Sequence, residues 1–302
     1  MYKTIPLPEG YRRDDILAFH GRDTEGLAEQ VEPHRIRKGV LIDGIPVLFD
    51  VRFQDGAAEC TIAADGALTA QATQLIGDAL QNILALRIDP APFLAAVRTD
   101  PLLAAVAARQ SGLRIVQSAT IFEALTWAII GQQINLTFAI ALRRTFIEQA
   151  GRAHSSGLWC YPEARDVARL APEQLTGRKF SRSKAETLLR LARLLDSGQL
   201  ALEPLAKVGD VAAVAAVSAA LLAVKGIGPW TVNYTMLRGY GYPDCSLHGD
   251  VAIRAALQHL LGEDEKPDMA RTEALLAQYA PHRTMAAAHL WASLNPRQDS
   301  GT

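Results

Sequence analysis

The chain has 302 residues, of which 49% are apolar, so its length suits two compact domains that each bury a hydrophobic core. Its 31 Lys and Arg residues nearly balance its 32 Asp and Glu residues, and the formal charge of −1 excludes a strongly basic nucleic-acid coat protein. The sequence has no apolar run of about 18 residues and no secretory signal pattern at residues 1–10, which predicts a cytoplasmic protein without a membrane span.

The first 90 residues predict a small antiparallel β-sheet domain with helices. Asp43-Gly44 is a strong signal for a two-residue hairpin turn between two β-rich runs. Pro46 weakens the start of the second run, because proline cannot donate to a strand ladder. The basic residues 34–38 are interpreted as part of the solvent face of the first strand. The expected strands are residues 34–42, 45–53 and 58–63, and the expected helices are residues 14–19 and 68–86.

Residues 91–302 predict an all-helical region that is rich in alanine, as tightly packed helices often are. The three cysteines of the chain lie far apart and form no CxxC pair, which indicates reduced structural thiols rather than a zinc or iron–sulfur site. Several helical patterns begin directly after a typical N-cap residue. The expected N-caps are Thr120, Asn135, Ser181 or Ser183, Asp210 and Asp250. The expected helices are residues 92–98, 101–108, 121–132, 136–149, 183–194, 211–224, 229–238, 251–261, 269–279 and 285–294.

The most informative stretch is a turn at residues 225–228, between two of the expected helices. Pro229 is well placed at the first position of the second helix, because its missing N–H is not needed there. Two glycines around one apolar residue allow a tight turn that presents free backbone N–H groups, which favours contact with phosphate. A Gly-x-Gly tripeptide alone is also typical of an ordinary connection between helices. The turn residues are Lys225, Gly226, Ile227 and Gly228.

A longer string is more specific than the glycines alone. Lys-Gly-Ile-Gly-Pro-Trp-Thr at residues 225–231, with Asp250 following 24 residues after Gly226, resembles the helix-hairpin-helix DNA glycosylase superfamily. Within that superfamily the sequence is similar to the bacterial 3-methyladenine DNA glycosylase II group. The segments at residues 130–133 and 289–291 belong to the same resemblance, which therefore covers nearly the whole chain.

The resemblance implies an α+β fold with two parts. The first is the N-terminal sheet domain, at residues 1–90. The second is an all-α helix-hairpin-helix glycosylase core at residues 91–302, in which the hairpin occupies residues 211–238. Two helical subdomains are expected to flank an active-site cleft in this core.

The resemblance also implies that Asp250 is the catalytic residue. Breaking the bond between a purine and its sugar builds oxocarbenium character on C1′, which a nearby carboxylate stabilises while it orients or deprotonates water. An N3- or N7-alkylated purine is cationic and already a good leaving group, so no general acid is required. Asp250 is also a suitable N-cap for the next helix, and the two roles are compatible. We expect Asp244 to begin a turn and His248 to lie in a loop or to face DNA.

Aromatic residues are expected to form the pocket for the flipped base. Trp230, Tyr234 and Trp291 match pocket positions of the family, and Phe19 of the N-terminal domain is expected to reach the same pocket. Cation–π attraction to an alkylated base is worth on the order of 0.5–2 kcal/mol. For Trp291 and Phe19, a role as core residues is an equal alternative. Val251 stands where the family carries an aromatic residue, which implies a pocket that stacks less strongly.

The resemblance assigns the DNA contacts to the hairpin and to the loop after residue 131. Flipping a base costs a few kcal/mol, and the family fills the gap with a side chain from this loop. Either Gln133, which departs from the apolar residue of the family, or Ile134 is the expected wedge. The basic residues 177–184 either contact phosphate or form a solvated turn. The expected DNA-binding residues are Lys225, Gly226, Ile227, Gly228, Gln132, Gln133 and Ile134.

Trp230 stands where lyase-type members of the superfamily carry the lysine that forms a Schiff base, so the resemblance implies a monofunctional hydrolase. We expect no cofactor and no catalytic metal, although the hairpin carbonyls are a candidate site for a monovalent cation. The expected partner is double-stranded DNA with alkylated bases, bound by a nucleoid-associated monomer. The alternatives are a bifunctional glycosylase/lyase for oxidised or mismatched bases and a non-catalytic hairpin module. The sequence leaves the range open among 3-methyladenine, 7-methylguanine, hypoxanthine and ethenoadenine.

Overall fold

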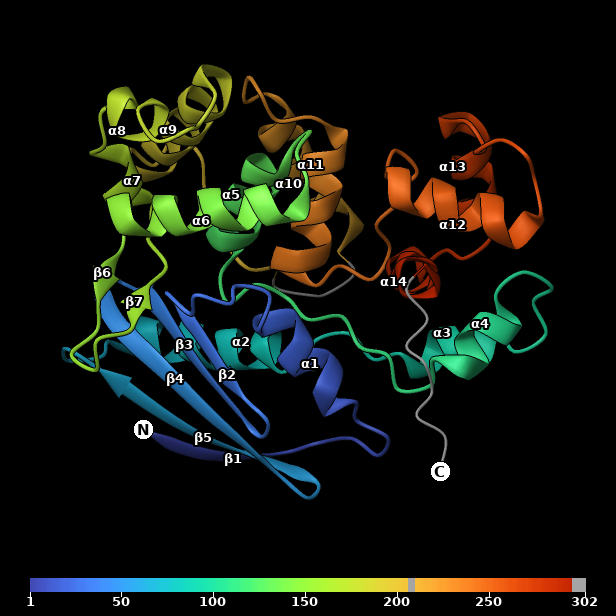
Figure 1. The fold of residues 1–302 in the computed structure, drawn as a ribbon, viewed down its shortest axis with the longest axis horizontal. Helices are drawn as coiled ribbons and strands as arrows, with labels where there is room; N and C mark the ends of the chain where they lie inside the picture. Colours follow the sequence, from blue (N-terminus) through green and yellow to red (C-terminus); the bar gives the residue numbers. More distant parts are fainter. Residues whose placement is uncertain (206–209, 295–302) are drawn as a thin grey trace.

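The computed structural model describes residues 1–205 and 210–294, which form an α+β fold (Figure 1). A sheet built from N-terminal residues lies at the lower left of the view, and helices from the rest of the chain lie above and beside it. This arrangement confirms the expected fold class. Among the described residues, no helix is both long enough and apolar enough to cross a membrane.

The main sheet has five antiparallel strands in the order β1-β5-β4-β3-β2. The three predicted strands are confirmed, and Asp43 and Gly44 form the turn between two of them with φ values of 52° and 75°. The sequence patterns do not predict the two outer strands, because these are short and one is rich in charged residues, as edge strands often are. The strands are β1 (Tyr2–Pro6), β2 (Glu29–Glu32), β3 (Arg35–Ile42), β4 (Ile45–Gln54) and β5 (Ala57–Ala64).

Helices α1 (Arg13–His20) and α2 (Ala70–Ile83) pack on this sheet and close one hydrophobic core with it. The buried residues of α2 include Ala72, Ile76 and Ile83, whose spacing places them on one helical face. The chain's three cysteines are buried and free, in agreement with their interpretation as structural thiols.

The interpretation of residues 34–38 as a solvent face is wrong for Lys38, whose side chain is only 2% exposed. Side chains alternate between the two faces of a strand, so Lys38 lies on the same face as the buried Ile36. A buried ammonium group requires opposite charges, and Glu29 and Glu123 provide them. The sequence pattern of one strand cannot reveal these partners, because they come from β2 and from a distant helix.

From residue 91 on, the described part of the chain is mainly helical and also holds the two-residue strands β6 (Arg152–Ala153) and β7 (Trp159–Cys160). The ten predicted helices of this region all form, and the helix expected at residues 229–238 continues as a π-helix, η1 (Met236–Tyr240). Two five-residue helices, α7 and α8, escape prediction because they are too short to show a helical period. The predicted N-caps Thr120, Asn135, Asp210 and Asp250 accept backbone hydrogen bonds, as does Ser181. The helices are α3 (Ala91–Ala96), α4 (Ala104–Arg109), α5 (Ile121–Gly131), α6 (Leu136–Ala150), α7 (Ala164–Ala168), α8 (Pro172–Thr176), α9 (Arg182–Asp196), α10 (Val211–Leu222), α11 (Pro229–Thr235), α12 (Val251–Leu261), α13 (Met269–Ala277) and α14 (Arg283–Ser293).

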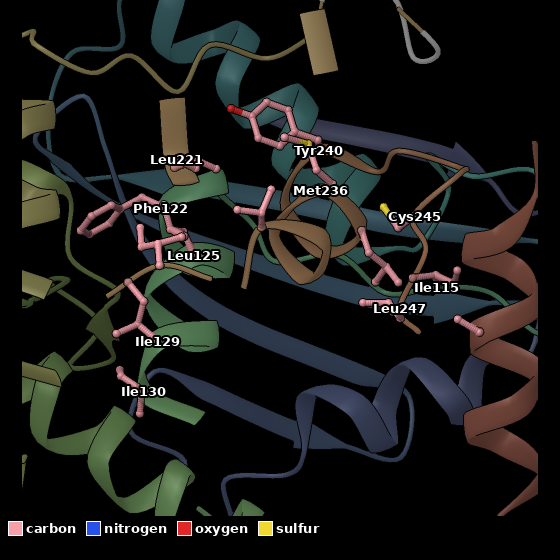
Figure 2. Packing of buried hydrophobic residues seen from close by; sticks show 14 of the residues in the cluster. Ile115, Phe122, Leu125, Ile129, Ile130, Leu221, Met236, Tyr240, Cys245 and Leu247 are labelled. Carbon is pink, nitrogen blue, oxygen red and sulfur yellow. The ribbon is translucent and has the colours of Figure 1, made fainter. Parts of the chain in front are cut away.

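A second hydrophobic core holds the helices together. Figure 2 shows its centre, where Leu125 and Ile129 of α5 lie near Leu221 of α10 and Met236 of η1. This packing fixes α10 and α11 against α5. The hairpin between α10 and α11 and the aromatic side chains of α11 are therefore carried on a rigid support.

Candidate active site

Asp250 lies at the N-terminus of α12, where four N–H groups converge on its carboxylate. Oδ1 accepts hydrogen bonds from the backbone N–H groups of Ala252 and Ile253 at 2.9 and 3.1 Å, and from Nε1 of Trp291 at 3.1 Å. Oδ2 accepts a hydrogen bond from Nε1 of Trp230 at 3.0 Å. These donors fix the orientation of the half-buried carboxylate and satisfy it as an acceptor. The N-cap role and the placement beside two pocket aromatics therefore coexist.

Trp230 and Tyr234 form an aromatic wall along α11. Their ring centroids are 5.1 Å apart and their planes are inclined by 31°. Trp127 of α5 extends the wall, because its Nε1 donates a hydrogen bond of 3.0 Å to the hydroxyl oxygen of Tyr234. All three side chains are half-buried, so each retains exposed surface. A planar base can stack on such surface while the hydrogen bond holds the wall in place.

Trp291 of α14 and Phe19 of α1 reach the same region from opposite ends of the chain. The guanidinium carbon of Arg238 lies 4.8 Å from the centre of the Phe19 ring and 5.8 Å from that of Trp291. The guanidinium carbon of Arg22 lies 3.8 Å from the centre of the Phe19 ring. Two cations therefore contact Phe19, while the hydrogen bond to Asp250 fixes Trp291. Both aromatic residues are half-buried, which distinguishes them from the fully buried side chains of the core.

The cavities of the described residues do not coincide with Asp250. A cavity of about 30 Å³ lies at the inner end of the aromatic wall, between Phe19, Trp127 and Tyr234, and has room for about one water molecule. A larger cavity of about 430 Å³ is lined by residues of α2, α5, α9 and η1, and Asp250 and its indole partners lie outside it. Empty volume is therefore a poor guide to this site, and hydrogen-bond geometry is the better one.

The turn between α10 and α11 requires glycine at one position. Gly226 has a φ of +98°, and a Cβ atom there would lie 2.1 Å from Oγ1 of Thr187. Gly228 has a φ of −107° and open space where a Cβ atom would lie. Ile227 is buried between the helices, and Lys225 is exposed. Within residues 1–205 and 210–294, the backbone N–H groups of Gly226 and Gly228 donate no hydrogen bond, so they are free to bind another molecule.

Replacement of Gly226 by Ala is expected to lower the free energy of unfolding by roughly 2–5 kcal/mol, through left-handed backbone strain and the clash with Thr187. Gly228→Ala is the matched control, and we expect it to cost less than about 1 kcal/mol because its backbone is extended and its surroundings are open. Urea unfolding of both variants measures the difference. Equal losses would contradict the tight packing of the turn against α9.

The three candidate residues in the loop between α5 and α6 have different surroundings and therefore different possible roles. Gln132 donates hydrogen bonds from Nε2 to the carbonyl oxygen of Gly226 at 3.2 Å and to Oγ1 of Thr231 at 2.9 Å, which ties the loop to the hairpin. Gln133 is exposed and has a positive φ of 56°. Ile134 is partly buried and packs against the helical core. Of the two candidate wedges, Gln133 is the one with a free side chain.

The basic residues 177–184 are partly engaged within the protein. Nζ of Lys184 donates a hydrogen bond of 2.7 Å to the carbonyl oxygen of Ile130 at the end of α5, and burial lowers its pKa. Arg182 forms an exposed ion pair with Glu186 at 2.9 Å. These two cations therefore have partners without DNA, which favours the structural interpretation for them.

Two further polar residues near Asp250 in the sequence, Asp244 and His248, are engaged by other partners. Asp244 forms an ion pair of 2.7 Å with Arg283 at the start of α14. His248 is half-buried, and its Nδ1 lies 3.0 Å from Oγ of Ser246. Neither side chain forms a hydrogen bond or ion pair with Trp230, Tyr234 or Trp127, whereas the indole groups of Trp230 and Trp291 both donate to Asp250.

A family model, described as HhH-GPD superfamily base excision DNA repair protein, matches residues 126–282. The chain belongs to this superfamily. It is also similar to DNA-3-methyladenine glycosylase of Bacillus subtilis, with 32% identity over 206 residues, which is 67% of this chain and 67% of the relative. With DNA-3-methyladenine glycosylase 2 of Escherichia coli it shares 29% identity over 195 residues, or 63% of each chain. The chain thus spans about two thirds of the length of these relatives, and the enzyme is a DNA glycosylase.

The fold of this glycosylase extends the similarity over nearly the whole chain. It superposes on the 3-methyladenine DNA glycosylase from Archaeoglobus fulgidus with a TM-score of 0.77, over 96% of this chain and 97% of that one. The sequence identity in this comparison is 19%, so the comparison supports the fold alone. The N-terminal sheet is therefore part of the shared architecture.

Sequence reasoning missed three residues at the aromatic wall of this glycosylase. Trp127, Arg22 and Arg238 lie outside the motifs that carry the resemblance. Trp127 lies inside the apolar helix α5, where an aromatic residue is usually part of the hydrophobic core. Arg238 follows Tyr234 by four residues, so the helical period places both on one face, and this spacing was the available signal. Arg22 follows Phe19 by three residues just after α1, but no motif marks it, and its second aromatic partner, Trp127, comes from a distant helix.

Proposed function

We propose that this glycosylase is monofunctional and excises N-alkylated purines of the 3-methyladenine type from duplex DNA by hydrolysis. The observation that carries the proposal is the Asp250 carboxylate, fixed by the indole N–H groups of Trp230 and Trp291 beside an aromatic wall. The names of its relatives from Bacillus subtilis and Escherichia coli support the same substrate class.

The proposed reaction needs one carboxylate. The bond between C1′ and the purine nitrogen breaks, and its electron pair stays with the base, which leaves as a neutral molecule when it was cationic. The positive charge that develops on the sugar is stabilised by Asp250. The oxygen of a water molecule then adds to C1′, and Asp250 or solvent takes the released proton. The indole donors keep the carboxylate in place throughout, which spares the cost of reorganising it.

Hydrolysis without strand cleavage is proposed because Trp230 occupies the position of the lyase lysine. Its Nε1 is committed to Asp250, and it offers no amine for a Schiff base. The buried Lys38 is held by two carboxylates, and Lys184 is held by a carbonyl oxygen of α5. Lys225 is exposed on the far side of the hairpin glycines, where a contact with phosphate is the proposed role.

Duplex DNA is proposed to bind across the hairpin and the loop between α5 and α6. The free amides of Gly226 and Gly228 are suited to phosphate oxygens, which they contact without regard to sequence. The exposed Gln133 is proposed to fill the gap that the flipped nucleotide leaves, where its amide group can bond to the orphaned base. We propose that the enzyme engages DNA as a monomer, in the cytoplasm and on the nucleoid.

Incubation with methylated duplex DNA tests this proposal. We expect chromatography to detect free 3-methyladenine, and we expect the strands to stay intact until alkali cleaves the abasic sites. Strand cleavage without alkali would favour the bifunctional glycosylase/lyase. Binding to DNA without release of any base would favour a non-catalytic hairpin module.

A further inference from the structure

We propose that Arg22 and Arg238 set the charge preference of the base pocket. Relative to a pocket without them, the two guanidinium groups raise the excision of flipped bases that are uncharged and carry a carbonyl oxygen, and lower that of cationic bases. The inference rests on the proposed function, because it concerns the same pocket, and it adds a selection rule that the aromatic residues alone do not predict.

A local hydrogen bond to the end of α1 holds Arg22 beside the aromatic wall. Its Nε donates a hydrogen bond of 2.8 Å to the carbonyl oxygen of Phe19. Its guanidinium carbon lies 3.8 Å from the centre of the Phe19 ring and 5.6 Å from that of Trp127. The charge is therefore fixed between a residue of the N-terminal part and the wall that Trp127 shares with Tyr234.

Arg238 approaches the pocket from the other side. It lies on η1, and its Nη1 donates a hydrogen bond to the carbonyl oxygen of Val116. Its guanidinium carbon is 5.8 Å from the centre of the Trp291 ring, and the N–H of that ring donates to Asp250. Nε of Arg238 is buried and has no hydrogen-bond partner. Arg238 is thus separated from the catalytic carboxylate by a single aromatic ring.

Both guanidinium groups are partly buried, and neither has a carboxylate as a direct partner. Neither Arg22 nor Arg238 forms an ion pair with any carboxylate of the described chain. Burial lowers the pKa of both guanidinium groups, and the nearby Tyr234 acts in the opposite direction and raises the pKa of each. An arginine remains protonated even so, because its usual pKa lies far above neutral. The two arginines therefore place positive charge beside Phe19, while the carboxylate of Asp250 lies on the Nε1 side of the Trp291 ring and that of Glu29 acts on Arg22.

The two guanidinium charges affect both the binding of the flipped base and the cleavage of its bond to C1′. A cationic base meets like charges, because the Phe19 ring on which it would stack is already in contact with Arg22 and Arg238. An uncharged base with a carbonyl oxygen instead accepts N–H groups from the guanidinium. When its bond to C1′ breaks, the electron pair gives the departing base negative charge, which a nearby cation stabilises. A cationic base leaves as a neutral molecule and gains nothing from this effect.

The experiment compares two 6-oxopurines that differ in charge. Single-turnover excision is measured on duplexes that carry one hypoxanthine, which is neutral, or one 7-methylguanine, which is cationic. We expect Arg22→Met and Arg238→Met each to shift the ratio of the two rates by about 10-fold in favour of 7-methylguanine. Arg238→Lys keeps the charge, so we expect its ratio to stay within about 3-fold of the wild type. The exposed Arg271→Met is a control for the loss of a remote cation.

The outcomes separate this inference from the proposed function. Unchanged ratios in both methionine variants, with the wild type active on 7-methylguanine, would overturn the inference and leave the function intact. Equal slowing of both substrates would assign the arginines a structural role and also overturn it. Failure of the wild type to release either base would overturn both proposals together. Unfolding midpoints of all variants show which of them fold, and the two arginines provide independent tests.

Discussion

Replacement of Asp250 by Asn is expected to slow base release by about 10³-fold or more, while the protein stays folded. Asparagine matches the shape of the side chain and is an equally good N-cap, so α12 keeps its backbone hydrogen bonds. It carries no charge, however, and cannot stabilise an oxocarbenium ion. Its amide also offers only one acceptor oxygen, so one of the two indole donors of Trp230 and Trp291 loses its partner.

Single-turnover release of 3-methyladenine measures this effect. Asp268→Asn is the matched control, because Asp268 caps α13 through the N–H of Arg271 at 2.8 Å and lies outside the site. We expect the control to release the base at the wild-type rate. Binding of both variants to a duplex with an abasic site is expected to stay within a few-fold of the wild type. Wild-type release by Asp250→Asn would exclude this carboxylate from the chemistry.

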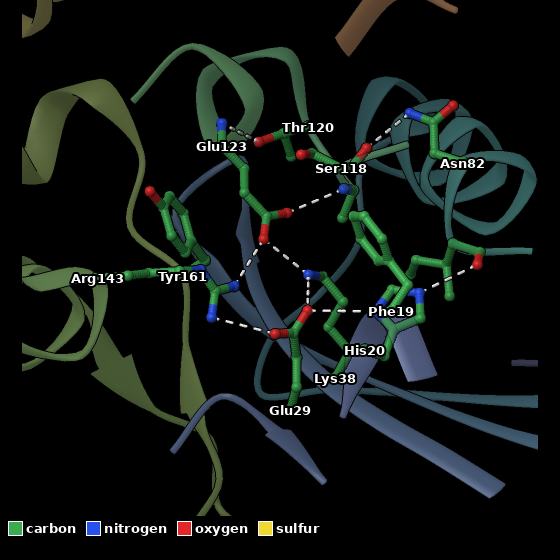
Figure 3. A network of polar contacts seen from close by, with 12 residues as sticks. Phe19, His20, Glu29, Lys38, Asn82, Ser118, Thr120, Glu123, Arg143 and Tyr161 are labelled. Carbon is green, nitrogen blue, oxygen red and sulfur yellow. Dashed lines mark hydrogen bonds and ion pairs between the residues drawn. The ribbon is translucent and has the colours of Figure 1, made fainter. Parts of the chain in front are cut away.

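Replacement of Lys38 by Met is expected to lower the free energy of unfolding by about 3–5 kcal/mol. Figure 3 shows the network that this change disrupts, in which Lys38 and Arg143 lie between two carboxylates. Lys38 Nζ contacts Glu29 and lies 2.7 Å from Glu123. Arg143 lies 2.8 Å from Glu123 and 3.1 Å from Glu29. Without Lys38, the two buried carboxylates share Arg143, and Glu29 also keeps its contact with Nδ1 of His20 at 3.3 Å.

The pKa values of Glu29 and Glu123 explain why the loss of Lys38 destabilises the protein. Burial alone would raise their pKa values, but Arg143 and Lys38 hold the pKa of Glu29 well below its usual 4.5 and also lower that of Glu123. A carboxyl group with a lowered folded-state pKa contributes stability above its unfolded pKa and loses it as the pH falls through the folded value. In Lys38→Met the folded pKa values rise, so protonation relieves the unpaired charge. The deficit of the variant should therefore shrink as the pH falls from 7 toward 4.

Arg35→Met is the control on the same strand. Arg35 is partly exposed and pairs with Asp50 at 2.6 Å, so we expect a loss of no more than about 1 kcal/mol. Urea unfolding at pH 7 and pH 4 compares the two variants. A loss in Lys38→Met that equals the control, or one that is independent of pH, would contradict the closed network.

Local signals predicted much of the fold. The Asp43-Gly44 turn, the N-caps and the helical periods each depend on a few neighbouring residues, and the structure confirms them. The outer strands and the five-residue helices carry too few residues for a period. Lys38 was misplaced because its burial depends on Glu29 and Glu123, which no local pattern connects to it.

The residues of the candidate site also fall into those that the sequence predicted and those that it did not. Motif spacing singled out Asp250, Trp230, Tyr234 and Trp291, and the structure brings these four side chains together. The arginines beside Phe19 were not predicted: the contact of Arg238 joins η1 to the distant α1, and Arg22, although close to Phe19 in sequence, belongs to no motif. Tertiary packing alone decides which charges surround the aromatic rings.

The candidate site combines side chains from α1 and from α14, which are far apart in the sequence. Phe19 lies near the end of α1, Arg22 follows that helix, and Trp291 lies on α14, so all three lie outside the segment 126–282 that the family model matches. A partly synthesised chain would possess the hairpin and Asp250 yet lack the second indole that orients the acid. The full set of hydrogen bonds to Asp250 should accordingly form only once α14 has folded against α12.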